Sequence, residues 1–305
     1  MTLKPRKLES GETIGVVAPA SPMKPDLLAK GIQYLEKCGY KLKIGSHVND
    51  VYGYMAGSER DRVNDIHEMF KDPEVQAIFC TRGGYGTPRI LDLLDYKIIQ
   101  SHPKIFVGFS DITAFQLAVF KKTQLVTFSG PMVAVEMGKG INPFTAQYFW
   151  NMITVSEPVQ KFSGLHCIKP GVAEGRLLGG NLSMICSLIG SPYLPDFQNA
   201  ILFLEDVGEE PYRIDRKLMQ LKLAGILENV NGIVFGQFEG CEPRAGNQSL
   251  SIEQVLDDIL FDLEVPMAGD LKYGHIEVKY TIPLGVDVCL DANEGYLQIK
   301  DSPVI

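Results

Sequence analysis

The first 130 residues alternate between short apolar runs and amphipathic helix patterns. Apolar runs begin at Thr13 and at Val75, and the apolar residues of 26–38 and 58–70 have the spacing that places them on one helix face. Strands that alternate with helices in this way predict a mostly parallel sheet with helices on both faces. Ligands of such sheets bind at the carboxyl ends of the strands, so functional residues are expected in the loops that follow the apolar runs.

The pattern changes after a turn at 169–171. The predicted elements beyond it are helices at 182–188, 215–224 and 251–261, strands at 200–204 and 232–238, and short antiparallel strands in the tail at 280–300. We therefore expect an N-terminal α/β domain at 1–145, a connector at 146–170 and a C-terminal, β-rich α+β domain at 171–305.

Composition narrows the class of function. The chain has 29 Lys and Arg against 37 Asp and Glu, a net charge of −8, which argues against nucleic acid as a partner because phosphate binding needs a basic face. The six cysteines are scattered, as is usual in a reducing compartment. No secretory signal and no apolar run of about 18 residues is present, so we expect a cytoplasmic protein without a membrane partner. No metal-binding motif such as H-E-x-x-H occurs, and we expect neither a metal nor a cofactor.

One apolar run, 105–107, ends in Gly108-Phe109-Ser110-Asp111, and a helix pattern follows at once. A strand, a tight turn and a helix together present a side chain at the sheet edge and aim helix N–H groups at the same place. Ser110 could therefore be a nucleophile. Serine or aspartate before a helix is, however, more often an N-cap, and on this stretch alone that interpretation is favoured for Ser110 and Asp111.

A glycine loop, Arg82-Gly83-Gly84-Tyr85-Gly86, follows the apolar run 75–80. Its glycines allow backbone N–H groups to approach a ligand closely. The loop has neither the Walker A pattern nor the dinucleotide spacing. It is either a glycine-rich turn or a contact for a peptide or an oxyanion.

A nucleophilic serine needs a base and a group that orients the base. His275 comes directly after a glycine at the end of a strand-like run, and Glu205 and Asp206 come directly after four apolar residues. Buried carboxylates need a partner, which makes the pair notable. The residues alone leave open that His275 is a surface histidine and that Glu205 merely begins a loop.

The motifs taken together resemble those of one family. They are Val17-Ala18-Pro19-Ala20-Ser21, Arg82-Gly83-Gly84-Tyr85-Gly86, Gly108-Phe109-Ser110-Asp111-Ile112-Thr113, Thr127-Phe128-Ser129-Gly130-Pro131-Met132, Gly179-Gly180-Asn181-Leu182, Leu204-Glu205-Asp206 and Gly274-His275. In this order and over nearly the whole chain, the set resembles the LD-carboxypeptidases, serine peptidases that include murein tetrapeptide carboxypeptidases and microcin-immunity peptidases.

The resemblance implies a flavodoxin-like N-terminal sheet and a triad with Ser110 as nucleophile, Glu205 as orienting carboxylate and His275 as base. It implies an oxyanion hole formed by the N–H of Asp111 and an N–H of the glycine loop, assigned to Gly84 to within one residue. It also implies a site in a cleft between the domains, a homodimer, and removal of the terminal D-alanine from cytoplasmic murein tetrapeptides during peptidoglycan recycling.

The terminal carboxylate of such a substrate needs a cationic partner, and Arg82 and Arg213 are candidates on chemical grounds. Tyr85 of the glycine loop is a third candidate for substrate binding. Two alternatives stay open: an immunity-type peptidase that cleaves a peptide–nucleotide antibiotic, and a non-catalytic, flavodoxin-like protein that binds a small molecule. The diamino acid at the third peptide position, lysine or diaminopimelate, cannot be deduced from these residues.

Overall fold

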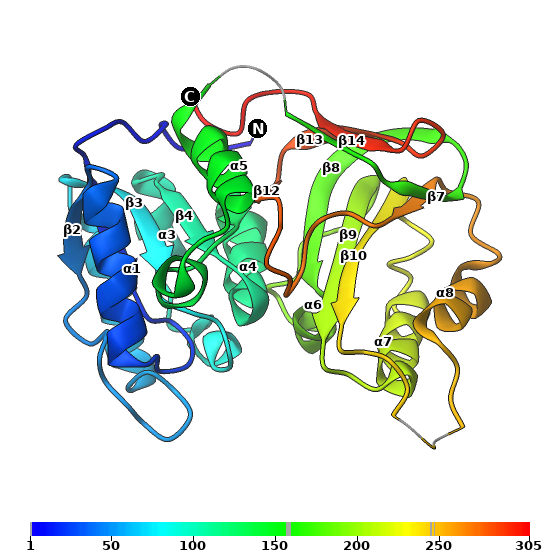
Figure 1. Cartoon of the computed structure of the whole chain (residues 1–305), viewed down its shortest axis with the longest axis horizontal. Coiled ribbons are helices and arrows are strands. Elements are labelled where there is room, and N and C mark those ends of the chain that lie inside the picture. The colour runs from blue at the N-terminus through cyan, green and yellow to red at the C-terminus, as the bar shows by residue number, and fades with distance from the viewer. Residues whose placement is uncertain (1, 157–159, 245, 247) are drawn as a thin grey trace.

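Two sheets lie side by side in the computed structural model, and helices pack around both (Figure 1). The structure describes residues 2–156, 160–244, 246 and 248–305. The first sheet has six strands in the order β12-β5-β4-β3-β1-β2. The second has eight, in the order β6-β14-β13-β8-β9-β10-β11-β7. Within the described residues, no helix combines the length and hydrophobicity needed to cross a bilayer.

The first sheet has the flavodoxin-like order, because its parallel strands run 2-1-3-4-5 across it. These are β1 (Thr13–Val17), β2 (Lys41–Ile44), β3 (Val75–Cys80), β4 (Ile105–Gly108) and β5 (Thr127–Ser129). A late strand, β12 (Ile282–Leu284), pairs antiparallel with β5 and forms one edge. The expected α/β fold with a parallel first sheet is confirmed.

The helices of this part include two that the sequence predicted to within one residue. They are α1 (Pro25–Lys37) and α2 (Glu59–Lys71), and the remaining ones are α3 (Tyr96–Ser101), α4 (Thr113–Thr123) and α5 (Pro143–Thr154). Ser58 caps α2 by accepting a hydrogen bond from the N–H of Asp61. Apart from Lys121, Lys122 and its C-cap, α4 is buried, because it packs against its own sheet and also against β8, β12 and α6. It lies at the centre of the molecule, between the two halves (Figure 1).

The second sheet is mixed. Its strands are β6 (Lys161–Ser163), β7 (His166–Lys169), β8 (Val172–Asn181), β9 (Ala200–Val207), β10 (Gly232–Glu239), β11 (Met267–Gly269), β13 (Asp287–Asp291) and β14 (Tyr296–Ile299). β8 to β11 run parallel, and the remaining pairs are antiparallel. Helices α6 (Leu182–Leu188), α7 (Pro211–Leu223) and α8 (Ile252–Leu260) belong to this half. The β-rich second part is therefore as expected.

The ten-residue strand β8 was missed by sequence analysis, which predicted no strand between the turn at 169–171 and the helix at 182–188. The glycines that hid it have a packing reason. A Cβ atom on Gly179 would lie 1.9 Å from the carbonyl oxygen of Phe203 in β9, and one on Gly180 would lie 2.7 Å from Cγ2 of Thr113. Glycine here lets β8 lie against both β9 and the start of α4, which brings the two halves together.

The strand pairing does not follow the proposed boundaries 1–145, 146–170 and 171–305 at every point. The connector supplies β6 and β7 to the second sheet, and the C-terminal segment supplies β12 to the first. The division of the chain into domains at these residues stays a prediction.

Candidate active site

Ser110 lies on a strained turn between β4 and α4. Its φ of 66° is in the left-handed region, which costs a residue with a side chain about 1–3 kcal/mol. Gly108, two residues earlier, makes the turn feasible, because a Cβ atom there would lie 2.4 Å from Cγ2 of Ile112. The turn therefore holds the Ser110 side chain at the carboxyl end of β4, a geometry that resembles a nucleophile elbow.

Neither Ser110 nor Asp111 caps a helix, so that interpretation of the sequence was wrong. The short 3₁₀ helix Ser110–Ile112 and α4 both begin without a side-chain cap. The Ser110 hydroxyl bonds instead to His275, and the Asp111 carboxylate bonds to Thr87. Both side chains are thus engaged in contacts between distant parts of the chain.

Ser110, His275 and Glu205 form a hydrogen-bonded chain. Oγ of Ser110 lies 3.0 Å from Nε2 of His275, and Nδ1 of His275 lies 2.8 Å from Oε2 of Glu205. Glu205 is fully buried in β9, and as a carboxylate it accepts the Nδ1–H. That hydrogen bond leaves Nε2 free to accept the proton of the Ser110 hydroxyl. The arrangement has the geometry of a nucleophile, a base and an orienting group.

A buried polar network binds the second carboxylate oxygen of Glu205, Oε1. Nδ2 of Asn181 lies 2.9 Å from Oε1 of Glu205 and 3.1 Å from Oδ1 of Asp206. Asp206 also accepts hydrogen bonds from the N–H and hydroxyl of Ser183, and it pairs with Lys217 at 3.1 Å. Sequence analysis gave these residues no role. The clue available in the sequence was Asn181, which directly precedes a predicted helix. Its Oδ1 caps α6, while its Nδ2 donates to the two carboxylates.

One aromatic side chain packs against the His275 ring. The Phe109 ring lies 4.6 Å from it, centroid to centroid, and Tyr273 packs edge-on against Phe109. The Tyr273 hydroxyl lies 2.7 Å from Oγ of Ser129. Burial, and then the nearby Glu205 charge, raise the pKa of Tyr273 well above its usual value, so this phenol stays protonated.

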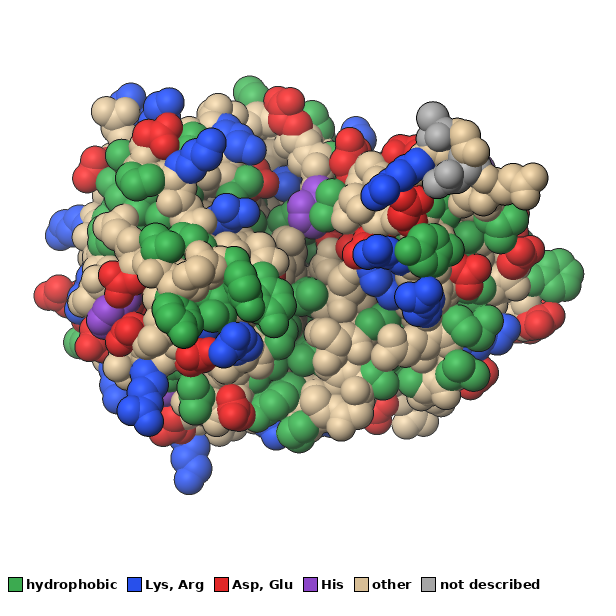
Figure 2. All heavy atoms as spheres, turned by 90° about the horizontal axis from the view of Figure 1, so that it is seen from below, with side chains coloured by type: hydrophobic (Ala, Val, Ile, Leu, Met, Phe, Trp, Pro, Cys, Tyr) green, Lys and Arg blue, Asp and Glu red, His purple; other side chains and the backbone are tan. Residues whose placement is uncertain are grey.

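Ser110 and His275 border a pocket of about 780 Å³. Its lining residues include Arg82, Gly83, Gly84, Phe109, Ser110, Glu136, Lys139, Asn142, Val207, His275, Glu277 and Lys279. Figure 2 shows the face onto which the parallel strands of both sheets point, where side chains of both charges surround a hollow between the two halves. Lys279 is buried and paired with Glu136 at 2.6 Å, which leaves Arg82 and Lys139 as the cations of the wall without a carboxylate partner among the described residues.

The glycine loop lies against the Ser110 turn. A Cβ atom on Gly83 would lie 2.9 Å from the carbonyl oxygen of Phe109, 3.0 Å from Cβ of Ser110 and 3.3 Å from the Asp111 nitrogen. No residue with a side chain fits there. The backbone of Gly83 is therefore close to the Asp111 N–H, one of the two expected oxyanion donors.

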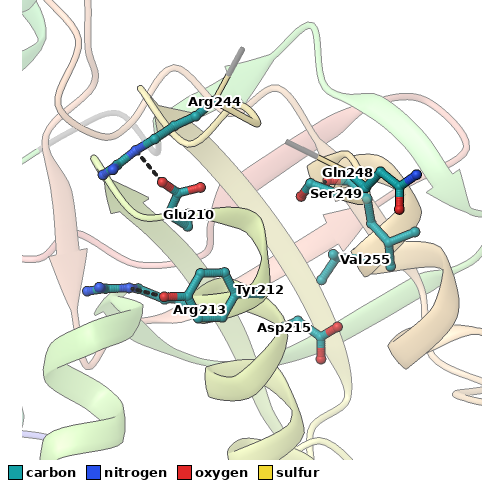
Figure 3. A pocket seen from close by; sticks show the side chains of 9 residues that line it. Glu210, Tyr212, Arg213, Asp215, Arg244, Gln248, Ser249 and Val255 are labelled. Atoms are coloured by element: carbon teal, nitrogen blue, oxygen red, sulfur yellow. Dashed lines mark hydrogen bonds and ion pairs between the residues drawn. The ribbon is translucent and has the colours of Figure 1, made fainter. Parts of the chain in front are cut away.

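The structure separates the three expected substrate-binding residues. Arg82 lines the pocket of Ser110. Arg213 instead lines a pocket of about 390 Å³ in the second half, where its guanidinium bonds to the hydroxyl of Tyr212 (Figure 3). Tyr85 is 47% exposed and contacts Tyr54 edge-on, and it is not among the residues that line the pocket of Ser110.

One group among the described residues could hold a metal ion. His47, Asp50 and Asp61 place ligand atoms within 4.8 Å of one another. None of them lines the pocket of Ser110. His47 already bonds through Nδ1 to the buried Asp65. Ion pairs among these side chains therefore also explain why they lie together.

Comparison with known proteins identifies the family. Residues 14–130 match the LD-carboxypeptidase N-terminal domain, and residues 174–290 match the LD-carboxypeptidase C-terminal domain. A probable murein peptide carboxypeptidase of Bacillus subtilis is 40% identical over 96% of this chain and 93% of the relative.

Solved structures agree with this match. The crystal structure of muramoyltetrapeptide carboxypeptidase from Oxalobacter formigenes superposes with a TM-score of 0.88 at 32% identity, covering 96% of this chain and all of that one. The microcin C7 self-immunity protein, in complex with aspartyl sulfamoyl adenosine, superposes with a TM-score of 0.92 at 25% identity, covering 99% of this chain and all of that one. This chain therefore belongs to the LD-carboxypeptidase family of peptidases.

Proposed function

We propose that this protein is a serine LD-carboxypeptidase that removes the terminal D-alanine from murein tetrapeptides. The observation that carries the proposal is the hydrogen-bonded chain Ser110–His275–Glu205 at the wall of a peptide-sized pocket. Its support from outside the chain is the likeness to murein peptide carboxypeptidases.

In the first half of the reaction, Ser110 attacks the carbonyl carbon that precedes the D-alanine. His275 takes the serine proton on Nε2, while Glu205 holds the ring and stabilises its positive charge. The carbonyl oxygen becomes an oxyanion that accepts hydrogen bonds from the N–H of Asp111 and of Gly84. Loss of one such donor lowers kcat by about 100- to 1,000-fold in comparable sites. His275 then returns the proton to the leaving amine, and D-alanine departs.

In the second half, water attacks the acyl-enzyme. His275 takes a proton from the water, the oxyanion hole stabilises the second tetrahedral intermediate, and the bond to Ser110 breaks as His275 returns the proton to its oxygen. The products are free D-alanine and a tripeptide. The reaction needs no group beyond the residues named.

Arg82 is the proposed partner of the terminal carboxylate. It lines the same pocket as Ser110, and one of its nitrogens donates to the carbonyl oxygen of Pro22 at 3.2 Å, which fixes the guanidinium near the glycine loop. An Arg–carboxylate pair provides both charge and orientation. It would select substrates that end at the residue after the scissile bond, as a carboxypeptidase requires.

The test is D-alanine release from defined tetrapeptides with lysine or diaminopimelate at the third position, followed by mass spectrometry. The wild-type protein should release D-alanine and leave the tripeptide, and Ser110→Ala should release none. Full activity of Ser110→Ala would reject the assignment. Labelling of Ser110 by a serine-reactive phosphonate separates this function from the non-catalytic binding protein, which would leave the serine unmodified.

The likeness to the microcin C7 self-immunity protein favours one alternative substrate, a peptide–nucleotide conjugate. Turnover of an aspartyl sulfamoyl adenosine compared with that of a murein tetrapeptide by the same preparation distinguishes the two. Action in the cytoplasm during peptidoglycan recycling, and a homodimeric state, are further parts of the proposal that rest on the family resemblance. Cell fractionation and analytical ultracentrifugation test them.

A further inference from the structure

We propose that Asp111 is a positioning residue, whose carboxylate keeps the two N–H donors of the oxyanion hole at a fixed distance from each other. The inference rests on the proposed serine peptidase function and deepens it. One donor of the hole is the N–H of Asp111 itself, and the other belongs to the glycine loop. The side chain of Asp111 bonds directly to the end of that loop.

The contact is short and buried. Oδ2 of Asp111 accepts a hydrogen bond of 2.9 Å from the N–H of Thr87 and a second one from the Thr87 hydroxyl. Asp111 is 2% exposed and Thr87 is fully buried. Thr87 follows Gly86 directly, so the carboxylate holds the glycine loop at its carboxyl-terminal end. A buried charge-assisted pair of this kind resists displacement, because breaking it leaves the carboxylate without partners.

The remainder of the loop is anchored to other parts of the first half. Ser21 donates its N–H to the carbonyl oxygen of Gly83 at 3.3 Å and accepts the N–H of Tyr85 at 3.0 Å. The buried Arg62 donates to the carbonyl oxygen of Gly86 at 3.0 Å. These bonds shape the loop, but they come from segments that do not carry the nucleophile. The Asp111 carboxylate, by contrast, lies on the residue next to Ser110.

Asp111 caps neither the 3₁₀ helix Ser110–Ile112 nor α4. Its carboxylate instead accepts the first N–H of the short 3₁₀ helix Thr87–Ile90, which directly follows the glycine loop. Its second oxygen, Oδ1, is buried without a hydrogen-bond partner among the described residues, which is costly. The bond to Thr87 ties the residue next to the nucleophile to the end of the glycine loop. It thereby sets the distance between the two proposed oxyanion donors.

The expected consequence is specific to the transition state. If the glycine loop moves away from the Asp111 N–H, the substrate carbonyl still binds, but its oxyanion loses part of its stabilisation. Asp111→Ala should therefore lower kcat by about 10- to 100-fold, less than the outright loss of a donor, and leave KM nearly unchanged. Asp111→Asn keeps an acceptor oxygen for both Thr87 bonds and should restore most of kcat.

Three measurements separate this role from a general loss of structure. The affinity for a phosphonate or boronate analogue of the tetrahedral intermediate should fall by the same factor as kcat/KM, while the affinity for the tripeptide product stays constant. The acidic limb of the pH profile of kcat/KM should not shift, because the bond between His275 and Glu205 is untouched. Asp65→Ala is the matched control: Asp65 is also a buried carboxylate that accepts a backbone N–H, that of His47, and its loss should lower stability without lowering kcat.

If Asp111→Ala does not fold, Thr87→Val carries the test, since it removes only the hydroxyl donor and should lower kcat in the same direction by a smaller factor. Wild-type kcat in either folded variant, with Ser110→Ala inactive, would overturn the inference and leave the peptidase function intact. A parallel loss of tripeptide affinity and of analogue affinity would also overturn it. Activity in Ser110→Ala would instead reject the proposed function itself.

Discussion

One amide nitrogen, Nδ2 of Asn181, lies between two buried carboxylates, 2.9 Å from Oε1 of Glu205 and 3.1 Å from Oδ1 of Asp206. Two neighbouring buried carboxylates repel each other strongly inside a protein unless a donor binds both of them. Asn181 therefore fixes the position of the carboxylate that bonds to His275. The next β9 residue, Asp206, is balanced in turn by Lys217.

Substitution of Asn181 should disturb the reaction through Glu205. Asn181→Asp keeps an oxygen that can cap α6, as Oδ1 does now for the N–H of Met184, but replaces the donor by a third acceptor. We expect kcat to fall by about 10-fold or more and the free energy of unfolding to fall by about 1–3 kcal/mol. Steady-state kinetics and urea denaturation measure the two effects. Asn231→Ala is the control for kcat, because Asn231 donates to the carbonyl oxygen of Glu174 and not to Glu205 or Asp206. It should leave kcat unchanged and lower stability only by the loss of that one hydrogen bond.

The backbone strain at Ser110 should be visible in stability. Glycine adopts a φ of 66° without the steric cost that a Cβ atom incurs, so Ser110→Gly should be more stable than Ser110→Ala by about 1 kcal/mol, with both inactive. Thermal or urea unfolding of the two variants gives the difference. At Ser187, which is exposed in α6, the order should reverse, because alanine is the better helix former. An Ala variant of Ser110 at least as stable as the Gly variant would show that the turn is not strained.

Arg82 and Arg213 provide a matched pair for the terminal carboxylate. Arg82→Met should lower kcat/KM for a tetrapeptide by about 10- to 100-fold, the cost of one charge-assisted hydrogen bond in a pocket. Arg213→Met should leave it unchanged, because Arg213 lies in a different pocket. The variants are compared on a tetrapeptide and on its C-terminal amide. Equal losses for both substrates in Arg82→Met would contradict the role of Arg82 in binding the carboxylate.

The buried position of Lys104 should make the free energy of unfolding depend on pH. It is 8% exposed, and burial lowers its pKa from 10.5 to about 8, although the Asp72 charge opposes that shift. Between pH 8 and pH 10.5 the unfolded chain thus holds more protons than the folded one, and the contribution of Lys104 to stability rises with pH. The free energy of unfolding of the wild type minus that of Lys104→Met should increase over this window. A difference that stays constant would disprove the assignment.

Lys43 is the control with the opposite sign. It is half-exposed, and its hydrogen bond to Asp72 raises its pKa. Its contribution is therefore present below the unfolded pKa and is lost as the pH rises through the folded pKa. The difference between wild type and Lys43→Met should therefore stay constant over the window in which that for Lys104→Met increases, and should decrease only above pH 10.5.

Local sequence patterns predicted the helices that bury a single face and the strands that are almost fully buried. Helices α1 and α2 show the apolar spacing of a single packed face, and β3 is apolar except for Gln76. Strand β8 was not predictable in this way. Its glycines look like a turn in sequence, and only the closeness of Phe203 and Thr113 explains them. Close approach between segments leaves no periodic signal.

The candidate site was predictable only in part from its residues. Ser110 could be singled out because a strand, a tight turn and a helix meet there, but on that stretch alone an N-cap was the favoured interpretation. Nothing in the spacing places Glu205 or His275 beside it, since each reaches Ser110 through the packing of one sheet against another. Their assignment came from the family resemblance. Arg213 shows the limit of chemical type alone, because a suitable cation in a plausible segment lies in another pocket.

The segment that carries His275 is fastened at both ends to different sheets. It leaves β11 in the second sheet and enters β12, which completes the edge of the first sheet beside β5. Residues 270–281 therefore act as a strap across the two halves. Any rocking of one sheet against the other would pull on this strap and change the distance between His275 and Ser110. The length of the hydrogen bond between these two residues thus depends on how the two halves are positioned. A chain cut near residue 145 would leave β5 without one of its two neighbours, β12.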